Sequence, residues 1–294
     1  MENSKSVKKI KVAELFYSLQ GEGQYLGTPS IFLRVFGCNF KCAGFSMPRG
    51  QLSEERLAID PKQYTDYKAL PLVHTGCDSY ASWDPRFKHL SPMMEVGEIV
   101  DKMEELLPNG MFGNDAHLII TGGEPLLGWQ KMYPYLLAEI GRRQMGLNNI
   151  TFETNGTQQL DQDFLDFLKA NPFFPDLNIT FSVSSKLPSS GEKWEEAIRP
   201  EIIRQYFDNS HLTYFKWVVS NQDDYDDVVR AIDTYTEGLG EGMMANIPIY
   251  IMPAGGTTMH YNDNEKWVAD LCMKNGWRYT PRLQVQLWKN AWGT

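Results

Sequence analysis

The residues best suited to chemistry are three cysteines, Cys38, Cys42 and Cys77, together with the segment TGGEP at residues 121–125. Cys38 and Cys42 lie in GCNFKC, directly after an apolar run that resembles a strand, whereas Cys77 follows only after a long polar stretch. Three thiolates can bind three irons of a four-iron cluster and leave the fourth iron open to another ligand. Such a site supports chemistry as well as electron transfer.

The spacing of the cysteines is unusual and leaves alternatives open. Thirty-four residues, 43–76, separate Cys42 from Cys77. Closing a flexible spacer of that length costs about 2.5 kcal/mol more than closing one of two residues, which metal–thiolate bonding exceeds. His74 with the three cysteines would instead complete a Cys3His zinc set, and buried cysteines without a metal are the third possibility. Cys272 stands alone in a helical pattern, which predicts a small buried core residue.

The elements that must position these residues alternate between strands and helices. The predicted strands are rich in Ile, Val, Phe and Thr, and several are nearly continuous apolar runs, as in parallel strands covered on both faces. They are 31–36, 117–121, 149–154, 178–183, 214–219 and 247–252. The predicted helices are 93–107, 130–143, 163–169, 223–236 and 264–275. This pattern predicts an α/β fold, an open, partial parallel β/α barrel of about six strands, with ligands at the carboxyl ends of the strands.

Length and charge limit the classes of protein that remain. We expect residues 1–294 to form one domain, with 43–76 as an insertion in the cysteine loop that holds a short helix near 53–57, and 187–199 as a loose stretch. A net charge of −9 argues against broad binding to nucleic acid or membrane surfaces. No apolar run approaches the ~20 residues of a membrane span, and four cysteines do not form a disulfide framework. We therefore expect a cytoplasmic, reducing location.

Several segments, in this order, resemble the 7-carboxy-7-deazaguanine synthases, a family of radical S-adenosylmethionine (SAM) enzymes. They are FYSLQGEGQYLGTPSIFLRVFGCNFKC at 16–42, TGCDSYASWD at 75–84, TGGEP at 121–125, FETNG at 152–156, SVSSK at 182–186 and VQLWKN at 285–290. The chain departs from the family's common CxxxCxxC pattern, because Phe45 stands at the third cysteine position. The family context of Cys77, which is followed by Asp and Ser, assigns the third cluster ligand to that residue.

The resemblance implies a [4Fe-4S] cluster on Cys38, Cys42 and Cys77, with SAM on the open iron. The residues implied to contact SAM are Gly122, Gly123, Glu124, Glu153, Asn155, Ser184 and Lys186. The glycine pair would let the backbone approach closely, and Glu124 would accept from the methionine ammonium group. Lys186 could equally be a solvated charge at a strand end.

The substrate implied by the resemblance is 6-carboxy-5,6,7,8-tetrahydropterin, a flat ring that carries a carboxylate. Arg34 is a guanidinium in an otherwise apolar strand, and it would hold the carboxylate as a bidentate fork or form a buried ion pair. Gln20 and Glu22 would read the ring, and Thr121 would also contact the substrate. The implied Mg²⁺ would bind Ser79, with Asp78 assisting.

The resemblance implies that the radical derived from SAM removes hydrogen from C6 of the substrate, the ring contracts, ammonia leaves and 7-carboxy-7-deazaguanine forms, a precursor of queuosine and other deazapurines. No catalytic side chain is assigned, since the cofactor carries the radical. The implied partners are the small pterin substrate, a flavodoxin-like or other low-potential electron donor, and a second copy in a homodimer. The alternatives are a radical SAM enzyme that resembles glycyl-radical activases, and a zinc-bearing or metal-free binding protein.

Overall fold

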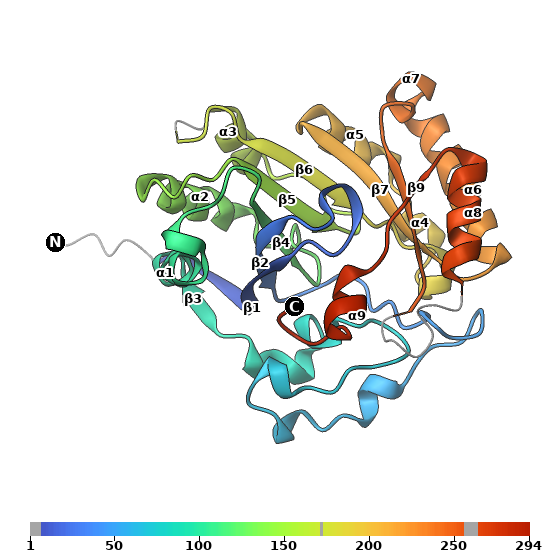
Figure 1. Cartoon of the computed structure of the whole chain (residues 1–294), viewed down its shortest axis with the longest axis horizontal. Helices are drawn as coiled ribbons and strands as arrows, with labels where there is room; N and C mark the ends of the chain where they lie inside the picture. The colour runs from blue at the N-terminus through green and yellow to red at the C-terminus, as the bar shows by residue number, and fades with distance from the viewer. Residues whose placement is uncertain (1–6, 171–172, 256–263) are drawn as a thin grey trace.

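The computed structural model describes residues 7–170, 173–255 and 264–294 as an α/β protein (Figure 1). The strands are β1 (Lys9–Leu19), β2 (Pro29–Val35), β3 (Met93–Glu95), β4 (His117–Gly122), β5 (Asn149–Thr154), β6 (Asn178–Val183), β7 (Leu212–Val219), β8 (Ile249–Pro253) and β9 (Arg278–Tyr279). The α-helices are α1 (Val96–Leu106), α2 (Tyr133–Arg142), α3 (Gln162–Ala170), α4 (Trp194–Ala197), α5 (Pro200–Asp208), α6 (Gln222–Leu239), α7 (Glu241–Met244), α8 (Glu265–Asn275) and α9 (Leu283–Trp288). Among these residues, no helix has both the length and the apolar character needed to cross a membrane.

Over the described residues the strands form one nine-stranded sheet in the order β3-β1-β2-β4-β5-β6-β7-β8-β9. β1 runs antiparallel to β2 and β3, whereas all neighbours from β2 to β9 are parallel. β3 and β9 lie at the two edges, so the sheet is curved but open, with helices arranged around its outside (Figure 1). The predicted α/β fold with an open, mostly parallel sheet is confirmed, and the six predicted strands correspond to β2 and β4–β8.

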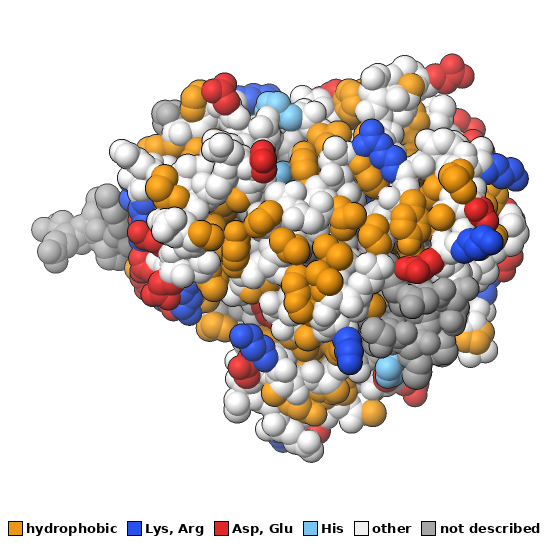
Figure 2. Space-filling model, in the orientation of Figure 1, with side chains coloured by type: hydrophobic (Ala, Val, Ile, Leu, Met, Phe, Trp, Pro, Cys, Tyr) orange, Lys and Arg blue, Asp and Glu red, His pale blue; other side chains and the backbone are white. Residues whose placement is uncertain are grey.

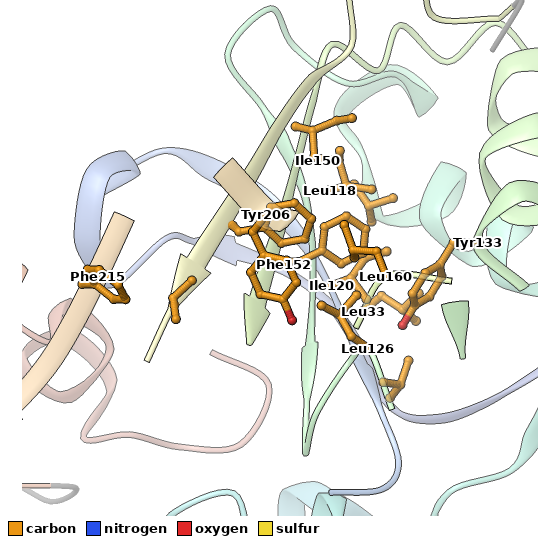
Figure 3. Close-up of a cluster of buried hydrophobic side chains, with 14 of the residues drawn as sticks. Leu33, Leu118, Ile120, Leu126, Tyr133, Ile150, Phe152, Leu160, Tyr206 and Phe215 are labelled. Atoms are coloured by element: carbon orange, nitrogen blue, oxygen red, sulfur yellow. The ribbon is translucent and has the colours of Figure 1, made fainter. Parts of the chain in front are cut away.

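The residues of the parallel strands explain why they lie at the centre. β4 has the sequence HLIITG, and its first five residues are buried, as expected for a strand covered on both faces. Figure 3 shows the core that β2, β4 and β5 build with the outer helices. Its labelled side chains are Leu33, Leu118, Ile120, Leu126, Tyr133, Ile150, Phe152, Leu160, Tyr206 and Phe215. Each such side chain contributes about 1.5–3 kcal/mol by burial.

The predicted helix at 93–107 begins later than expected. Met93–Glu95 form β3, which pairs with residues 9–11 of β1, and α1 follows from Val96. β1 itself was not predicted, because its burial does not alternate cleanly and its register with β2 shifts between Val12 and Glu14. The stretch 187–199 also differs from the loose segment expected, since it holds a 3-10 helix, Pro188–Ser190, and α4.

The segment 43–76, expected to be an insertion, folds into short 3-10 helices below the sheet in Figure 1. Its side chains Tyr67 and Val73 are buried in a separate hydrophobic cluster with Trp83 from the segment that follows. The carboxylate of Glu55 accepts hydrogen bonds from the backbone N–H groups of His74 (2.9 Å) and Thr75 (2.8 Å). The segment that leads to Cys77 is therefore held by its own packing and hydrogen bonds.

Candidate active site

A cavity of about 290 Å³ opens at the carboxyl ends of the parallel strands. It is lined by the ends of β2 and β4–β8, by the cysteine loop, and by the C-terminal segment that includes α9. Of the predicted site residues, the structure brings all but Glu124 to its wall. They are Gln20, Glu22, Arg34, Cys38, Cys42, Cys77, Ser79, Thr121, Gly122, Gly123, Glu153, Asn155, Ser184 and Lys186.

The three cysteines contribute to one wall of this cavity. Cys38 and Cys77 pack against the cluster formed by Phe40 and the buried Cys42. All three are free thiols, whereas Cys272 is buried separately in α8, as predicted. Burial, followed by the charge of Glu124, raises the pKa of the Cys38 thiol to about 12, and burial raises the pKa of Cys42 despite the charge of Lys186. Iron binding at this site would therefore release protons.

Three thiols are the donor set expected for a four-iron cluster with one open iron. Throughout the described residues, no group of three or more His, Cys, Asp or Glu side chains is placed to hold one metal ion. The His74 side chain that would complete the zinc set is exposed. A cluster places its three thiolates on three different irons, so its ligands need not converge on one point. The three thiols can thus hold a cluster with one open iron.

The glycine pair of TGGEP packs directly on the cysteine loop. Gly122 has a φ of +131°, which favours glycine. A Cβ atom on Gly123 would lie 2.1 Å from the carbonyl oxygen of Gly37 and 2.9 Å from Cβ of Cys38. The N–H of Glu124 donates to the same Gly37 carbonyl at 2.7 Å. The pair thus brings the end of β4 against the residue before the first cysteine.

Glu124 lies behind the cavity wall and is fully buried. Its Oε1 accepts hydrogen bonds from Thr154 Oγ1 (2.8 Å) and the N–H of Leu126 (3.1 Å), and its Oε2 accepts one from the N–H of Asn155 (2.7 Å). Burial raises the pKa of this carboxyl to about 7. In this geometry Glu124 holds the turn after β5, and its predicted contact with the ammonium group of SAM stays a prediction.

Glu153 is the centre of a polar network on the cavity floor. Its Oε1 accepts from Gln20 Nε2 at 3.1 Å, and its Oε2 accepts from Thr121 Oγ1 at 3.0 Å. The ammonium group of Lys216, from β7, lies 3.6 Å from Oε1. Two predicted substrate residues and one predicted SAM residue are therefore joined in one hydrogen-bonded group.

Glu22 is held by three residues that the sequence did not single out. Its Oε2 lies 2.7 Å from Lys216 Nζ, and its Oε1 lies 3.1 Å from Arg282 Nε and 2.7 Å from Gln284 Nε2. Although burial alone would raise the pKa of Glu22, the charges of Lys216 and Arg282 lower it. Burial disfavours the charged form of Lys216, but the charges of Glu22 and Glu153 outweigh this effect and raise the pKa of Lys216. Both Glu22 oxygens thus have partners within the protein.

Arg34 forms the buried ion pair that was one of its two expected roles. Its Nε lies 2.9 Å from Glu14 Oε2, across the β1–β2 pair, and burial raises the pKa of Glu14 despite this cation. The guanidinium also lines the cavity. A guanidinium that forms an ion pair through Nε and also lines a cavity has the chemistry to bind a carboxylate there.

The residues after Cys77 connect the cysteines to the C-terminal segment. Ser79 Oγ lies 3.5 Å from Cys77 Sγ. Asp78 Oδ2 accepts a hydrogen bond from Arg282 at 2.5 Å. Burial alone would raise the pKa of Asp78, but the charge of Arg282 lowers this pKa below its usual value. Arg282 therefore bridges Asp78 and Glu22 from the start of α9, which lies beside β1 and the insertion in Figure 1.

The strands β5 and β6 supply the remaining predicted contacts. Asn155 Nδ2 donates to Asn39 Oδ1, within the cysteine loop, at 2.9 Å. Lys186 Nζ donates to Ser184 Oγ at 3.1 Å and lies 6.0 Å from the centre of the Phe45 ring. Phe45, which replaces the third cysteine of the common pattern, therefore lines the cavity beside Lys186.

A parallel, open β/α barrel with three cysteines and a glycine turn at the carboxyl ends of its strands is the arrangement expected of the radical SAM class. No family model matches the chain. It is 29% identical over 289 residues to the 7-carboxy-7-deazaguanine synthase of Pyrobaculum aerophilum, with 97% of each chain covered. It is 28% identical to that of Halobacterium salinarum, with 96% of this chain and 91% of the relative covered.

A crystal structure of QueE from Escherichia coli shares the fold, with a TM-score of 0.54, 18% identity and 94% of each chain covered. The predicted resemblance to the 7-carboxy-7-deazaguanine synthases, which rested on separate motifs, thus extends over nearly the whole chain and is confirmed. This particular family of radical SAM enzymes is the one to which the chain is similar.

Proposed function

We propose that this protein is a radical SAM carbon–nitrogen lyase that converts 6-carboxy-5,6,7,8-tetrahydropterin to 7-carboxy-7-deazaguanine with loss of ammonia. The observation that carries the proposal is the convergence of Cys77 with Cys38 and Cys42 on one cavity wall, across a 34-residue spacer. The near full-length similarity to 7-carboxy-7-deazaguanine synthases supports the same reaction. When bound, the cluster and SAM supply the radical that starts it.

The chain's own residues are proposed to bind and orient the reactants. Cys38, Cys42 and Cys77 would hold the cluster. The residues proposed to contact SAM are Gly122, Gly123, Glu153, Asn155, Ser184 and Lys186, with Glu124 holding the turn behind them. The Arg34 guanidinium would bind the substrate carboxylate, because a planar fork matches its two oxygens. Gln20 and Thr121, which are both hydrogen-bonded to Glu153, would contact the substrate ring. Glu22 would hold Lys216 and Arg282 in place beside the ring.

Further features belong to the proposal. Ser79 would provide a hydroxyl ligand for Mg²⁺ beside the substrate. A low-potential donor such as a flavodoxin would reduce the cluster, and the reaction would take place in the cytoplasm. A homodimer is supported by the hydrophobic side chains that gather in the middle of the face shown in Figure 2. Leu26 and Leu287 are among the exposed large hydrophobic side chains of the described residues.

The test is anaerobic reconstitution followed by iron and sulfide analysis, and then turnover of the carboxytetrahydropterin with SAM and a reductant, followed by mass spectrometry. We expect about four irons per chain and formation of 7-carboxy-7-deazaguanine. Cys77→Ala should lose the cluster and turnover, whereas the matched control Cys272→Ala should keep both. One equivalent of zinc without iron, or full activity in Cys77→Ala, would refute the assignment.

A further inference from the structure

The second half of the cysteine loop is clamped by the segment 189–192, from the stretch that the sequence suggested was loose. The N–H of Gly44 donates to the Ser190 carbonyl at 2.8 Å. A Cβ atom on Gly44 would lie 2.6 Å from the backbone nitrogen of Gly191. The two backbones therefore approach as closely as glycine allows, so the path of the chain after Cys42 depends on this segment.

Glu192 extends the clamp to the cysteine itself. Its Oε1 accepts hydrogen bonds from the backbone N–H groups of Lys41 (2.8 Å) and Cys42 (2.7 Å). Cys42 has a φ of +49°, a left-handed conformation that a side chain other than glycine adopts only when its surroundings hold it. A single carboxylate oxygen thus holds the two peptide units that set the position of the second thiol.

The charge of Glu192 is not balanced by an ion pair. Among the described residues, no Lys, Arg or His group lies within 4.0 Å of its carboxylate, and the nearby Lys193 pairs with Glu196 instead. Lys186 is the cation whose charge acts on the Cys42 thiol. Glu192 therefore brings a negative charge to the cysteine loop and takes up two N–H groups that could otherwise donate to sulfur.

We propose that Glu192 is a positioning residue that shapes the loop from Cys38 to Cys42 and lowers the reduction potential of the cluster bound there. The inference rests on the proposed cluster site. Hydrogen bonds to cluster sulfurs and nearby positive charge raise a cluster's potential, so sequestering two donors and adding a carboxylate lower it. A low potential makes the reduced cluster a stronger reductant, which suits the reductive cleavage of SAM.

The first experiment uses the metal-free, reduced chain and measures the rate at which iodoacetamide alkylates Cys42. Glu192→Ala removes both hydrogen bonds, so we expect alkylation about tenfold faster than in the parent chain. Glu192→Gln keeps a carbonyl oxygen for the same two donors but loses the charge, so its rate should lie between those of the parent and Glu192→Ala. Glu195→Ala, which removes an exposed carboxylate three residues away, is the matched control and should not change the rate.

The second experiment measures the midpoint potential of the reconstituted cluster by dithionite titration. Glu192→Gln should raise it, because the charge is lost while the loop is kept. Glu192→Ala should raise it further, because the freed N–H groups can donate to sulfur. If Glu192 has a purely structural role, the midpoint potential of Glu192→Gln should equal that of the parent. That result would overturn the electrostatic part of the inference. Equal values for Glu192→Ala and Glu195→Ala in both experiments would overturn it entirely, whereas a parent chain without iron would refute the cluster assignment instead.

Discussion

The buried charges below the cavity allow a quantitative prediction for Lys216→Met. Lys216 is 5% exposed at its side chain, and its ammonium group contacts Glu22 at 2.7 Å and Glu153 at 3.6 Å. Removing one partner of a buried pair leaves an uncompensated charge and typically costs about 3–5 kcal/mol. In this variant Arg282 still balances the charge of Glu22, and Gln284 still donates a hydrogen bond to it. We therefore expect the lower value, a loss of about 3 kcal/mol from the free energy of unfolding.

The assay is urea unfolding of the metal-free chain at pH 7 under reducing conditions, followed by tryptophan fluorescence. With a denaturant slope of about 3 kcal/mol per M, the midpoint should fall by about 1 M. Lys102→Met is the control, because Lys102 forms a half-exposed helical pair with Glu98, worth about 0.3–0.5 kcal/mol. The double variant Lys216→Met with Glu22→Gln should be more stable than the sum of the single effects predicts, since the buried negative charge is also removed.

The same pair determines a pH dependence. Because Lys216 and Arg282 lower the folded-state pKa of Glu22 despite its burial, their contribution is present above the unfolded pKa of about 4.3 and is lost as the pH falls towards the folded value. The deficit of Lys216→Met should therefore be largest near neutral pH and shrink below about pH 4.3. Equal midpoints for Lys216→Met and Lys102→Met, with no coupling to Glu22→Gln, would refute the reasoning.

Two further predictions concern the substrate and the outer rim of the sheet. Arg34→Lys keeps the charge beside Glu14 but loses the fork, so KM for the carboxylated pterin should rise about tenfold or more in steady-state assays; an unchanged KM would contradict the carboxylate role. Burial lowers the pKa of His117 to about 4, so stability should fall as the pH drops from about 6.5 to 4. His117→Gln should flatten that slope in urea midpoints, and a slope equal to the parent's would contradict it.

The central sheet could be predicted from the sequence because its strands are nearly continuous apolar runs. β4, β5, β6 and β7 are covered on both faces, and this burial leaves a compositional signal in a few consecutive residues. β1 and β3 lack that signal. β1 is irregular where its register shifts, and β3 is a strand of three residues that merges with the pattern of α1.

The site could be predicted where chemistry is concentrated in short motifs, and not where it depends on distant contacts. Arg34 was recognised as a charge within an apolar strand, and Lys216 in LTYFKWVV carries the same signal, which was overlooked. Arg282 had no comparable signal. Its contacts to Glu22 and Asp78 span 260 and 204 positions, and only the folded position of α9 brings these groups together.

The 34-residue spacer before Cys77 is held in place by packing and hydrogen bonds in the folded chain. A flexible loop of that length would lose its conformational entropy when metal binds. In the folded chain, however, Tyr67 is buried and donates a hydrogen bond to the Ala81 carbonyl at 2.8 Å, and Glu55 holds the backbone just before the cysteine. The entropy is therefore lost when the chain folds, and the third thiol is already placed when iron arrives. The expanded spacing thus gives a third thiol that the fold already holds against the 38–42 loop, which is itself clamped by Glu192.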